Sequence, residues 1–147
     1  MEATVRIADV LRSKGSAVAT ITESTTVTGL LAELATHNIG AMVVVGSDGG
    51  IVGMVSERDV VRMLHEHGAD LLRRPVSDIM TGLVVTCSPN APIDDLSALM
   101  TNNRVRHVPV LDGARLAGIV SIGDIVKNRM DQLQAEQEHL HAYITGG

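Results

Sequence analysis

One seven-residue motif occurs twice in this chain, and it constrains the fold more than any other feature of the sequence. The motif reads glycine, apolar, valine, serine, two variable residues and aspartate, over residues 53–59 and again over 118–124. The two copies are 65 residues apart, whether measured between the glycines (118 − 53) or the aspartates (124 − 59). Because a fixed offset of this size in a chain of 147 residues indicates an internal duplication, we expect two copies of one small unit.

The similarity extends to both sides of the motif. Residues 18–45 match residues 84–111 at an offset of 66, and residues 7–11 match 76–80 at an offset of 69. The offset changes only in loop-like segments such as 47–50, where insertions are tolerated. A shared core with loop insertions is therefore predicted for the two copies.

The composition predicts an aliphatic core made by both copies together. One copy of roughly 60–70 residues would bury a marginal core. Apolar residues make up 45% of the chain, yet it has no Phe or Trp and one Tyr. The lack of aromatic stacking platforms and the net charge of −5 argue against nucleic-acid partners. The single cysteine, Cys87, excludes an intrachain disulfide and a cysteine-rich zinc site.

The chain also gives no membrane signal. A polar, charged stretch follows Met1, so no signal peptide is expected. No apolar run approaches the roughly 20 residues of a membrane span. We therefore expect a cytoplasmic protein without a membrane partner.

Each copy reads as strand, helix, strand, strand, helix. In the first copy, the patterns predict strands over 17–21, 41–45 and 51–55, a helix over 25–37, and a second helix from 56 to about 68. The second copy follows the same order.

Three segments follow from this pattern. We assign repeat 1 to residues 1–70, repeat 2 to residues 71–129, and a C-terminal helical extension to residues 130–147. The charged stretch 69–75 is expected to link the repeats, and it is too short for them to move far independently.

These features resemble the cystathionine β-synthase (CBS) domain pair, also called a Bateman module. The element order, the tandem arrangement and the doubled motif carry the resemblance, which covers residues 7 to about 129. Matching strand patterns at 39–44 and 105–110 precede the two motifs. The resemblance implies an α+β fold with a pseudo-two-fold axis; an unrelated α/β duplication is the alternative.

The serine and aspartate of the motif have two compatible interpretations. Ser56 and Ser121 are expected to cap helices, with Asp59 and Asp124 completing capping boxes. The resemblance adds a ligand role, in which the same carboxylate accepts hydrogen bonds from the hydroxyls of a ribose.

The resemblance implies two clefts, each joining the start of one repeat to the motif of the other. Met54 and Ile119, the apolar residues ahead of the serines, are expected to contact adenine. The primary cleft is expected to use Lys14, Gly15, Ala19, Gly40, Arg106, His107, Ile119, Ser121 and Asp124. The second cleft is expected to use Thr81, Val85, Met54, Ser56, Arg58 and Asp59.

The two clefts are not expected to be equivalent. Arg106 and His107 stand where the first repeat has Gly40 and Ala41, so the Asp124 cleft is expected to prefer a phosphate. A solvated surface charge is the alternative for Lys14 and for Arg58. AMP is the favoured ligand; NAD, ADP, ATP and S-adenosylmethionine are alternatives.

Catalysis and metal binding are not expected. The His65/His67 and His139/His141 pairs are two residues apart, which directs helical side chains away from each other. No phosphate-binding loop or nucleophile–base pair is readable. We therefore predict a regulatory module without enzyme activity. A structural interaction module with vestigial clefts is the alternative.

The C-terminal segment carries a heptad pattern. Val126, Met130, Leu133, Gln137, Leu140 and Ile144 are spaced 4, 3, 4, 3 and 4 residues apart. We expect this seam to pair with a second chain as a homodimer, and the output to reach a separate regulated protein. A helix lying along its own domain is the alternative.

Overall fold

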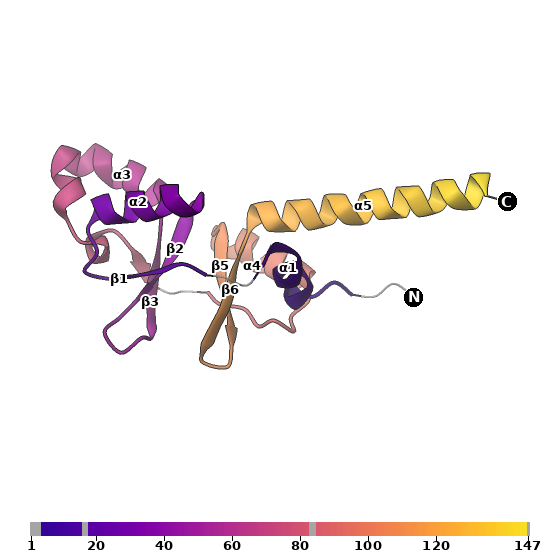
Figure 1. The fold of residues 1–147 in the computed structure, drawn as a ribbon, viewed down its shortest axis with the longest axis horizontal. Coiled ribbons are helices and arrows are strands. Elements are labelled where there is room, and N and C mark those ends of the chain that lie inside the picture. The colour runs from indigo at the N-terminus through magenta and orange to yellow at the C-terminus, as the bar shows by residue number, and fades with distance from the viewer. Residues whose placement is uncertain (1–3, 16–17, 83–84, 147) are drawn as a thin grey trace. The chain divides into compact units, whose positions relative to one another are not determined.

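The two repeats carry matching elements in the α+β order that the sequence predicts (Figure 1). The computed structural model describes residues 4–15, 18–82 and 85–146. The contacts between residues divide the chain into two compact units. The central unit is Val18–Val84, and the terminal unit is Met1–Ala17 together with Val85–Gly147. The elements are α1 (Ile7–Lys14), β1 (Thr20–Thr22), α2 (Val27–His37), β2 (Ala41–Val45), β3 (Ile51–Ser56), α3 (Glu57–His67), the 3-10 helices η1 (Gly68–Arg73) and η2 (Val76–Asp78), β4 (Thr81–Gly82), α4 (Ile93–Asn103), β5 (His107–Asp112), β6 (Arg115–Ser121) and α5 (Ile122–Thr145).

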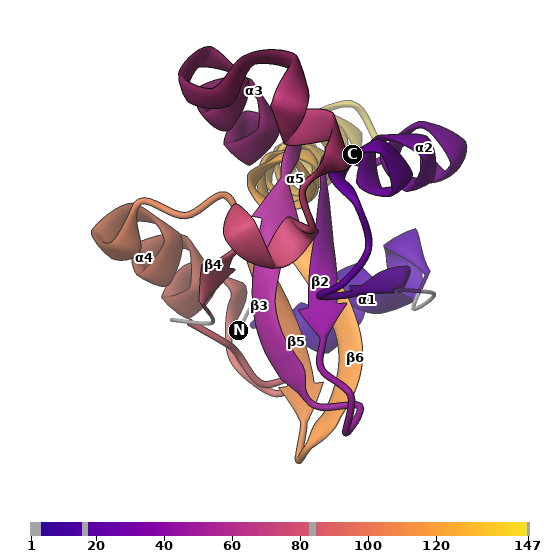
Figure 2. The ribbon, with the colours of Figure 1, turned by 90° about the vertical axis from the view of Figure 1, so that its left-hand side faces the viewer.

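The central unit is built on a sheet in the order β1-β2-β3-β4. Strand β1 runs parallel to β2, and β2 and β3 form an antiparallel hairpin, visible side by side in Figure 2. Helix α2 begins at Thr26, whose hydroxyl accepts a hydrogen bond from the Gly29 amide at 3.2 Å. It ends at Asn38, which adopts the left-handed conformation common at helix ends. The core is formed chiefly by Leu30, Leu34, Met42, Val44, Val55 and Leu71.

The stretch 69–75, expected to link the repeats, packs inside the central unit. Most of it forms η1, and Leu71 is fully buried in the core of this unit. The Val27 amide donates to the Arg74 carbonyl at 2.9 Å. The charged residues that suggested a linker lie on the outer side of this turn, while Leu71 fills the inner side.

The terminal unit contains the β5-β6 hairpin, α1, α4 and α5. The strand expected at 84–87 is reduced, over its described residues, to one parallel bridge between Cys87 and Val110. The Cys87 amide donates to Pro109 O at 3.1 Å, and Cys87 O accepts from Leu111 N at 2.8 Å. The core is formed chiefly by Ile7, Val10, Leu96, Met100, Val108, Val110 and Val120.

The first residues of each repeat pack against the other repeat. Residues 5–8 lie against residues 89–93 in the terminal unit, and residues 74–77 lie against residues 23–27 in the central unit. We call this the exchange of leading segments. The Ile7 amide donates to Ala91 O at 3.0 Å, and the Val76 amide donates to Thr25 O at 2.7 Å. These bonds are equivalent, because residues 7 and 76 differ by the offset of 69 and residues 25 and 91 by the offset of 66. The same correspondence relates Ile93 N–Val5 O to Val27 N–Arg74 O, and Ala8 N–Pro89 O to Ser77 N–Glu23 O.

This exchange explains the glycines of the repeated motif. A methyl group on Gly53 would lie 2.5 Å from the Thr81 carbonyl oxygen, and one on Gly118 would lie 2.6 Å from Leu11 Cδ2. In both units the close neighbour belongs to the exchanged segment. Glycine therefore leaves room for that segment to pack against the strand, and the room is tightest at Gly53, where the neighbour is a backbone atom.

Helix α5 is the longest element, at 24 residues, and it has no buried residue. None of the helices within the described ranges combines the length and apolar character needed to cross a membrane.

Candidate functional site

Both copies of the motif form capping boxes at the entrance of a helix. Ser56 caps α3 and Ser121 caps α5. The Ser121 hydroxyl accepts from the Asp124 amide at 3.1 Å, and the Ser121 amide donates to Asp124 Oδ2 at 2.8 Å. Ser56 and Asp59 make the same two bonds at 3.3 and 2.8 Å. The capping role predicted from the motif is confirmed.

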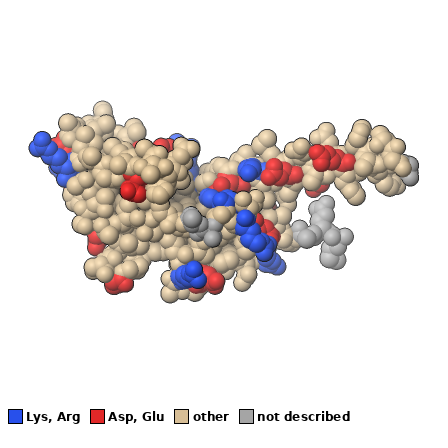
Figure 3. Space-filling view, viewed as in Figure 1, with Lys and Arg blue, Asp and Glu red and all other residues tan. Residues whose placement is uncertain are grey.

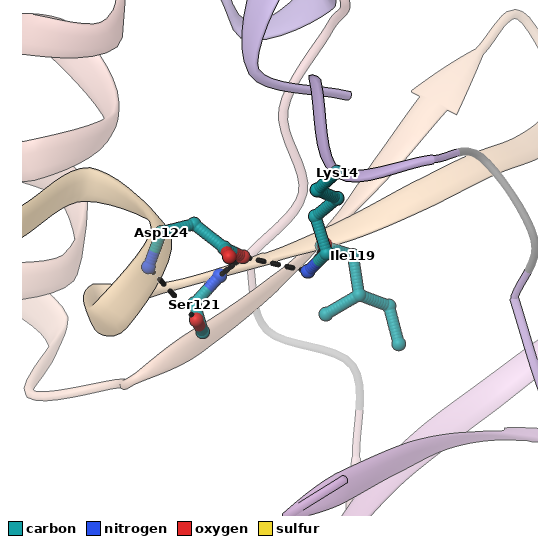
Figure 4. A network of polar contacts seen from close by, with 4 residues as sticks. All are labelled: Lys14, Ile119, Ser121 and Asp124. Carbon is teal, nitrogen blue, oxygen red and sulfur yellow. Dashed lines mark hydrogen bonds and ion pairs between the residues drawn. The ribbon is translucent and has the colours of Figure 1, made fainter. Parts of the chain in front are cut away.

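Asp124 forms an ion pair with Lys14, the last residue of α1 (Figure 4). Lys14 Nζ lies 2.6 Å from Asp124 Oδ2 and 2.8 Å from the Ile119 carbonyl oxygen. The exchange of leading segments makes this contact possible, since it packs α1 against β6 and α5. The terminal unit thus brings Lys14, Ile119, Ser121 and Asp124 together.

The Asp124 side chain is 21% exposed, so its carboxylate is only partly hydrated. Burial raises the pKa of Asp124, but hydrogen bonds and charge attraction from Lys14, together with hydrogen bonds from Ser121, outweigh it. The pKa of Asp124 therefore lies below its ordinary value. The site presents an ionised carboxylate at neutral pH.

Asp59 has a different partner. Arg62, one helical turn later on α3, places Nη2 2.6 Å from Asp59 Oδ1. The Ser56 hydroxyl donates to Asp59 Oδ2 at 3.0 Å, in addition to the bond from its amide. Both carboxylate oxygens of Asp59 therefore have donors from the start of α3. Sequence reasoning did not find Arg62, although a basic residue three positions after an acidic one on a helix is a recognisable signal.

The residues just before the second strand of each repeat lie beside these helix entrances. The Ile122 amide donates to Arg106 O at 2.9 Å, and the Glu57 amide donates to Gly40 O at the same distance. His107 pairs with Ser121 across the β5-β6 hairpin. Arg106 is exposed and His107 is half-buried, next to the entrance of α5.

The other predicted site residues divide between the two units. Ala19 and Gly40, predicted for the primary cleft, lie in the central unit, whereas Val85, predicted for the second cleft, lies in the terminal unit. Gly15 follows Lys14 and has a φ of 95°. In the central unit, Met54 pairs with Thr81 across β3 and β4, and exposed Arg58 lies in the first turn of α3.

The remaining polar groups define no further centre. Over the described part of the chain, no three His, Cys, Asp or Glu side chains come together as a metal site requires. Burial raises the pKa of the Cys87 thiol to about 11, so it stays protonated at neutral pH. Figure 3 shows acidic side chains beside each group of basic ones on the face drawn.

The fold and the doubled motif are those of a class of regulatory domains. Comparison with models of protein families identifies which family this is. The model of the CBS domain matches residues 7–66 and 76–131. The chain therefore belongs to the CBS-domain family and carries two copies of the domain.

Similar proteins include small CBS-domain proteins. The mitochondrial CBS domain-containing protein CBSX3 of Arabidopsis thaliana is 36% identical over 149 residues, covering 96% of this chain and 72% of that protein. The crystal structure of ATU1752 from Agrobacterium tumefaciens is 43% identical, with a TM-score of 0.81 over 84% of this chain and 92% of that one.

Two similar structures hold adenosine-containing ligands. The CBS-domain protein PAE2072 of Pyrobaculum aerophilum was solved with AMP; it is 26% identical, with a TM-score of 0.73 over 82% of this chain and 89% of its own. The CBS domain pair of MJ0100 was solved with 5′-methylthioadenosine and S-adenosylmethionine; it is 25% identical, with a TM-score of 0.74 over 84% of this chain and 98% of its own.

Proposed function

We propose that this protein is a regulatory module without enzyme activity that binds an adenine nucleotide, with AMP favoured over NAD, ADP and ATP. The observation that carries the proposal is the ionised carboxylate of Asp124, held at a helix entrance beside Lys14. The AMP bound to PAE2072 and the adenosyl ligands of MJ0100 support this ligand class.

Asp124 is the proposed ribose acceptor. Its Oδ2 accepts bonds from Ser121 and Lys14. Within residues 4–15, 18–82 and 85–146, no hydrogen bond to its Oδ1 is found. Since the Asp124 side chain is partly exposed, this oxygen can accept a hydrogen bond from a ribose hydroxyl. Since both oxygens of Asp59 already have donors, the Asp124 site is proposed as the tighter one.

Lys14 is the proposed phosphate contact of the same site. Its ammonium donates two hydrogen bonds, to Asp124 and to the Ile119 carbonyl, and a third N–H is left for a ligand. The entrance of α5 adds a positive helix-dipole end, and Arg106, whose carbonyl oxygen accepts from the Ile122 amide there, is the proposed second cation. A nucleotide would bind with its ribose on Asp124 and its phosphate near Lys14 and Arg106.

The proposed assembly is a homodimer through the exposed seam of α5, acting on a separate regulated protein. Val126, Met130, Leu133, Leu140 and Ile144 are all more than half exposed. Burying a large apolar side chain is worth about 1.5–3 kcal/mol, so a second chain that covers this seam gains stability.

A thermal-shift and calorimetric screen with AMP, ADP, ATP, NAD and S-adenosylmethionine tests the ligand. A nucleotide present at 100 times its Kd should stabilise the protein by about 2.7 kcal/mol. Asp131→Ala, an exposed aspartate of α5, is the matched control for Asp124→Ala. No shift with any nucleotide would favour the structural interaction module, and turnover of a nucleotide by the pure protein would favour an enzyme.

A further inference from the structure

The seam of α5 lies on a different face of the helix from the residues that pack on the terminal unit. Ile125 packs against the core, and Asn128 and Gln132 are half-buried along the same face. At about 100° per residue, the seam is centred about a third of a turn away from that face. From Leu133 to Gly146 every residue is exposed.

We propose that a second copy of this chain covers the seam in parallel and in register, so that each seam residue faces its own counterpart. This inference rests on the proposed homodimer and specifies its geometry. In heptad terms, Met130, Gln137 and Ile144 take position a, and Val126, Leu133 and Leu140 take position d. The partner that covers the seam is thus a second copy of the same chain.

Gln137 is the first reason for the parallel orientation. In a parallel pair it faces the partner's Gln137, and the two amides can hydrogen-bond to each other. In an antiparallel pair an a residue faces a d residue, so Gln137 would lie against the partner's Leu133. That arrangement would leave a polar amide against a leucine and lose the bond, which costs free energy.

The charges beside the seam are the second reason. Glu136 takes position g, and His141, five residues later, takes position e. In a parallel pair, Glu136 lies beside the partner's His141, which is a favourable or neutral contact. In the antiparallel alignment that keeps the seams together, Glu136 instead lies beside the partner's Glu136, and two like charges meet.

Disulfide trapping tests the orientation in the full-length chain. Cys87→Ser removes the native thiol, and Met130→Cys or Ile144→Cys then introduces a single one. In the parallel pair each new cysteine faces its own copy at a distance that a disulfide can span. Mild oxidation should therefore convert most of the protein to covalent dimer at both positions. Asp131→Cys, at an outward-facing position, is the control and should stay largely uncrosslinked.

An antiparallel pair of helices would give the opposite pattern of disulfide crosslinking. There, residue 130 would lie about 15 Å along the helix from its own copy and would face residue 140 instead. Covalent dimers that form only when Met130→Cys chains are mixed with Leu140→Cys chains would overturn the parallel arrangement.

Three further measurements separate this inference from the nucleotide proposal. Light scattering should find a dimer, and truncation after Arg129 should lower the oligomeric state while nucleotide affinity changes less than twofold. A monomeric full-length chain, or a dimer unchanged by truncation, would overturn the seam pairing. Neither result would affect the nucleotide proposal, because calorimetry on the same samples tests it separately.

Discussion

Lys14 Nζ reaches Asp124 Oδ2 at 2.6 Å across 110 residues of sequence, whereas Asp59, the equivalent aspartate, pairs with Arg62 three positions away on its own helix. The same motif therefore has a long-range cation in one unit and a local cation in the other. Because Lys14 ends the exchanged helix α1, the charge state of Asp124 is linked to the position of that helix. The ion pair of Asp59 with Arg62 involves no exchanged segment.

Removing the Asp124 carboxylate should weaken nucleotide binding far more than removing the Asp59 carboxylate. Charge-assisted hydrogen bonds to a ribose are worth about 1.5–3 kcal/mol, so Asp124→Ala should raise the Kd of AMP by about 10–100-fold. Calorimetry measures the affinity, and circular dichroism checks that the variant is folded. Equal affinities in wild type, Asp124→Ala and Asp59→Ala would rule out the ribose role.

Lys14→Met should separate phosphate recognition from adenosine recognition. If the ammonium contacts the phosphate, AMP should bind about tenfold more weakly to the variant, while adenosine, which lacks a phosphate, should bind about as well as to wild type. Lys127→Met, at the only other lysine and also exposed, is the control. A parallel loss of affinity for AMP and adenosine would show that Lys14 shapes the site without reading the phosphate.

The Lys14–Asp124 pair should make stability depend on pH in the acid range. The pKa of Asp124 is lowered in the folded protein, so its contribution is present above the unfolded pKa of about 3.9 and disappears as pH falls through the lower folded value. Lys14→Met should thus cost about 1 kcal/mol or less at pH 6, and the cost should shrink as pH falls below the unfolded pKa. Urea unfolding across this range measures the difference; a gap that grows on acidification would contradict the assignment.

The two motif glycines should differ in their tolerance of alanine. In Gly53→Ala the new methyl meets the backbone oxygen of Thr81, which cannot move without disturbing β4. In Gly118→Ala it meets the end of the Leu11 side chain, which can rotate. We expect Gly53→Ala to cost about 1–3 kcal/mol and Gly118→Ala clearly less. Denaturant titrations compare the free energies of unfolding of the two variants. An equal loss in both, or a larger loss in Gly118→Ala, would show that β4 can shift away from a methyl group at residue 53 more easily than this packing suggests.

The local elements could be predicted from the sequence because periodicity and capping are local signals. The helix over 25–37, the hairpin strands and both capping boxes follow from patterns within a few residues. The burial of Leu71 and the pairing of β4 with β3 could not be read this way, since both depend on tertiary contacts of short, charged or glycine-containing segments. Spacing alone does not single out Arg62, because Lys127 stands three positions after Asp124 in the same way, yet Asp124 pairs with Lys14.

The candidate site was predictable in part. The doubled motif pointed to Asp59 and Asp124, and the family resemblance joined Lys14 to the second motif. No pattern in the sequence indicated that the two aspartates would differ in their free oxygens. That difference arises from side-chain geometry, because Arg62 reaches Asp59 in one unit and Lys14 reaches Asp124 in the other.

The exchange of leading segments also sets the order in which the chain can fold during synthesis. The central unit is continuous in sequence and can close once residue 84 has left the ribosome. Helix α1 emerges before the central unit, yet Ile7 is buried in a cluster with residues such as Val108 and Val120, more than a hundred positions later. Helix α1 is therefore made before the central unit but docks after it, and until then its apolar face is open to chaperones or to another nascent copy.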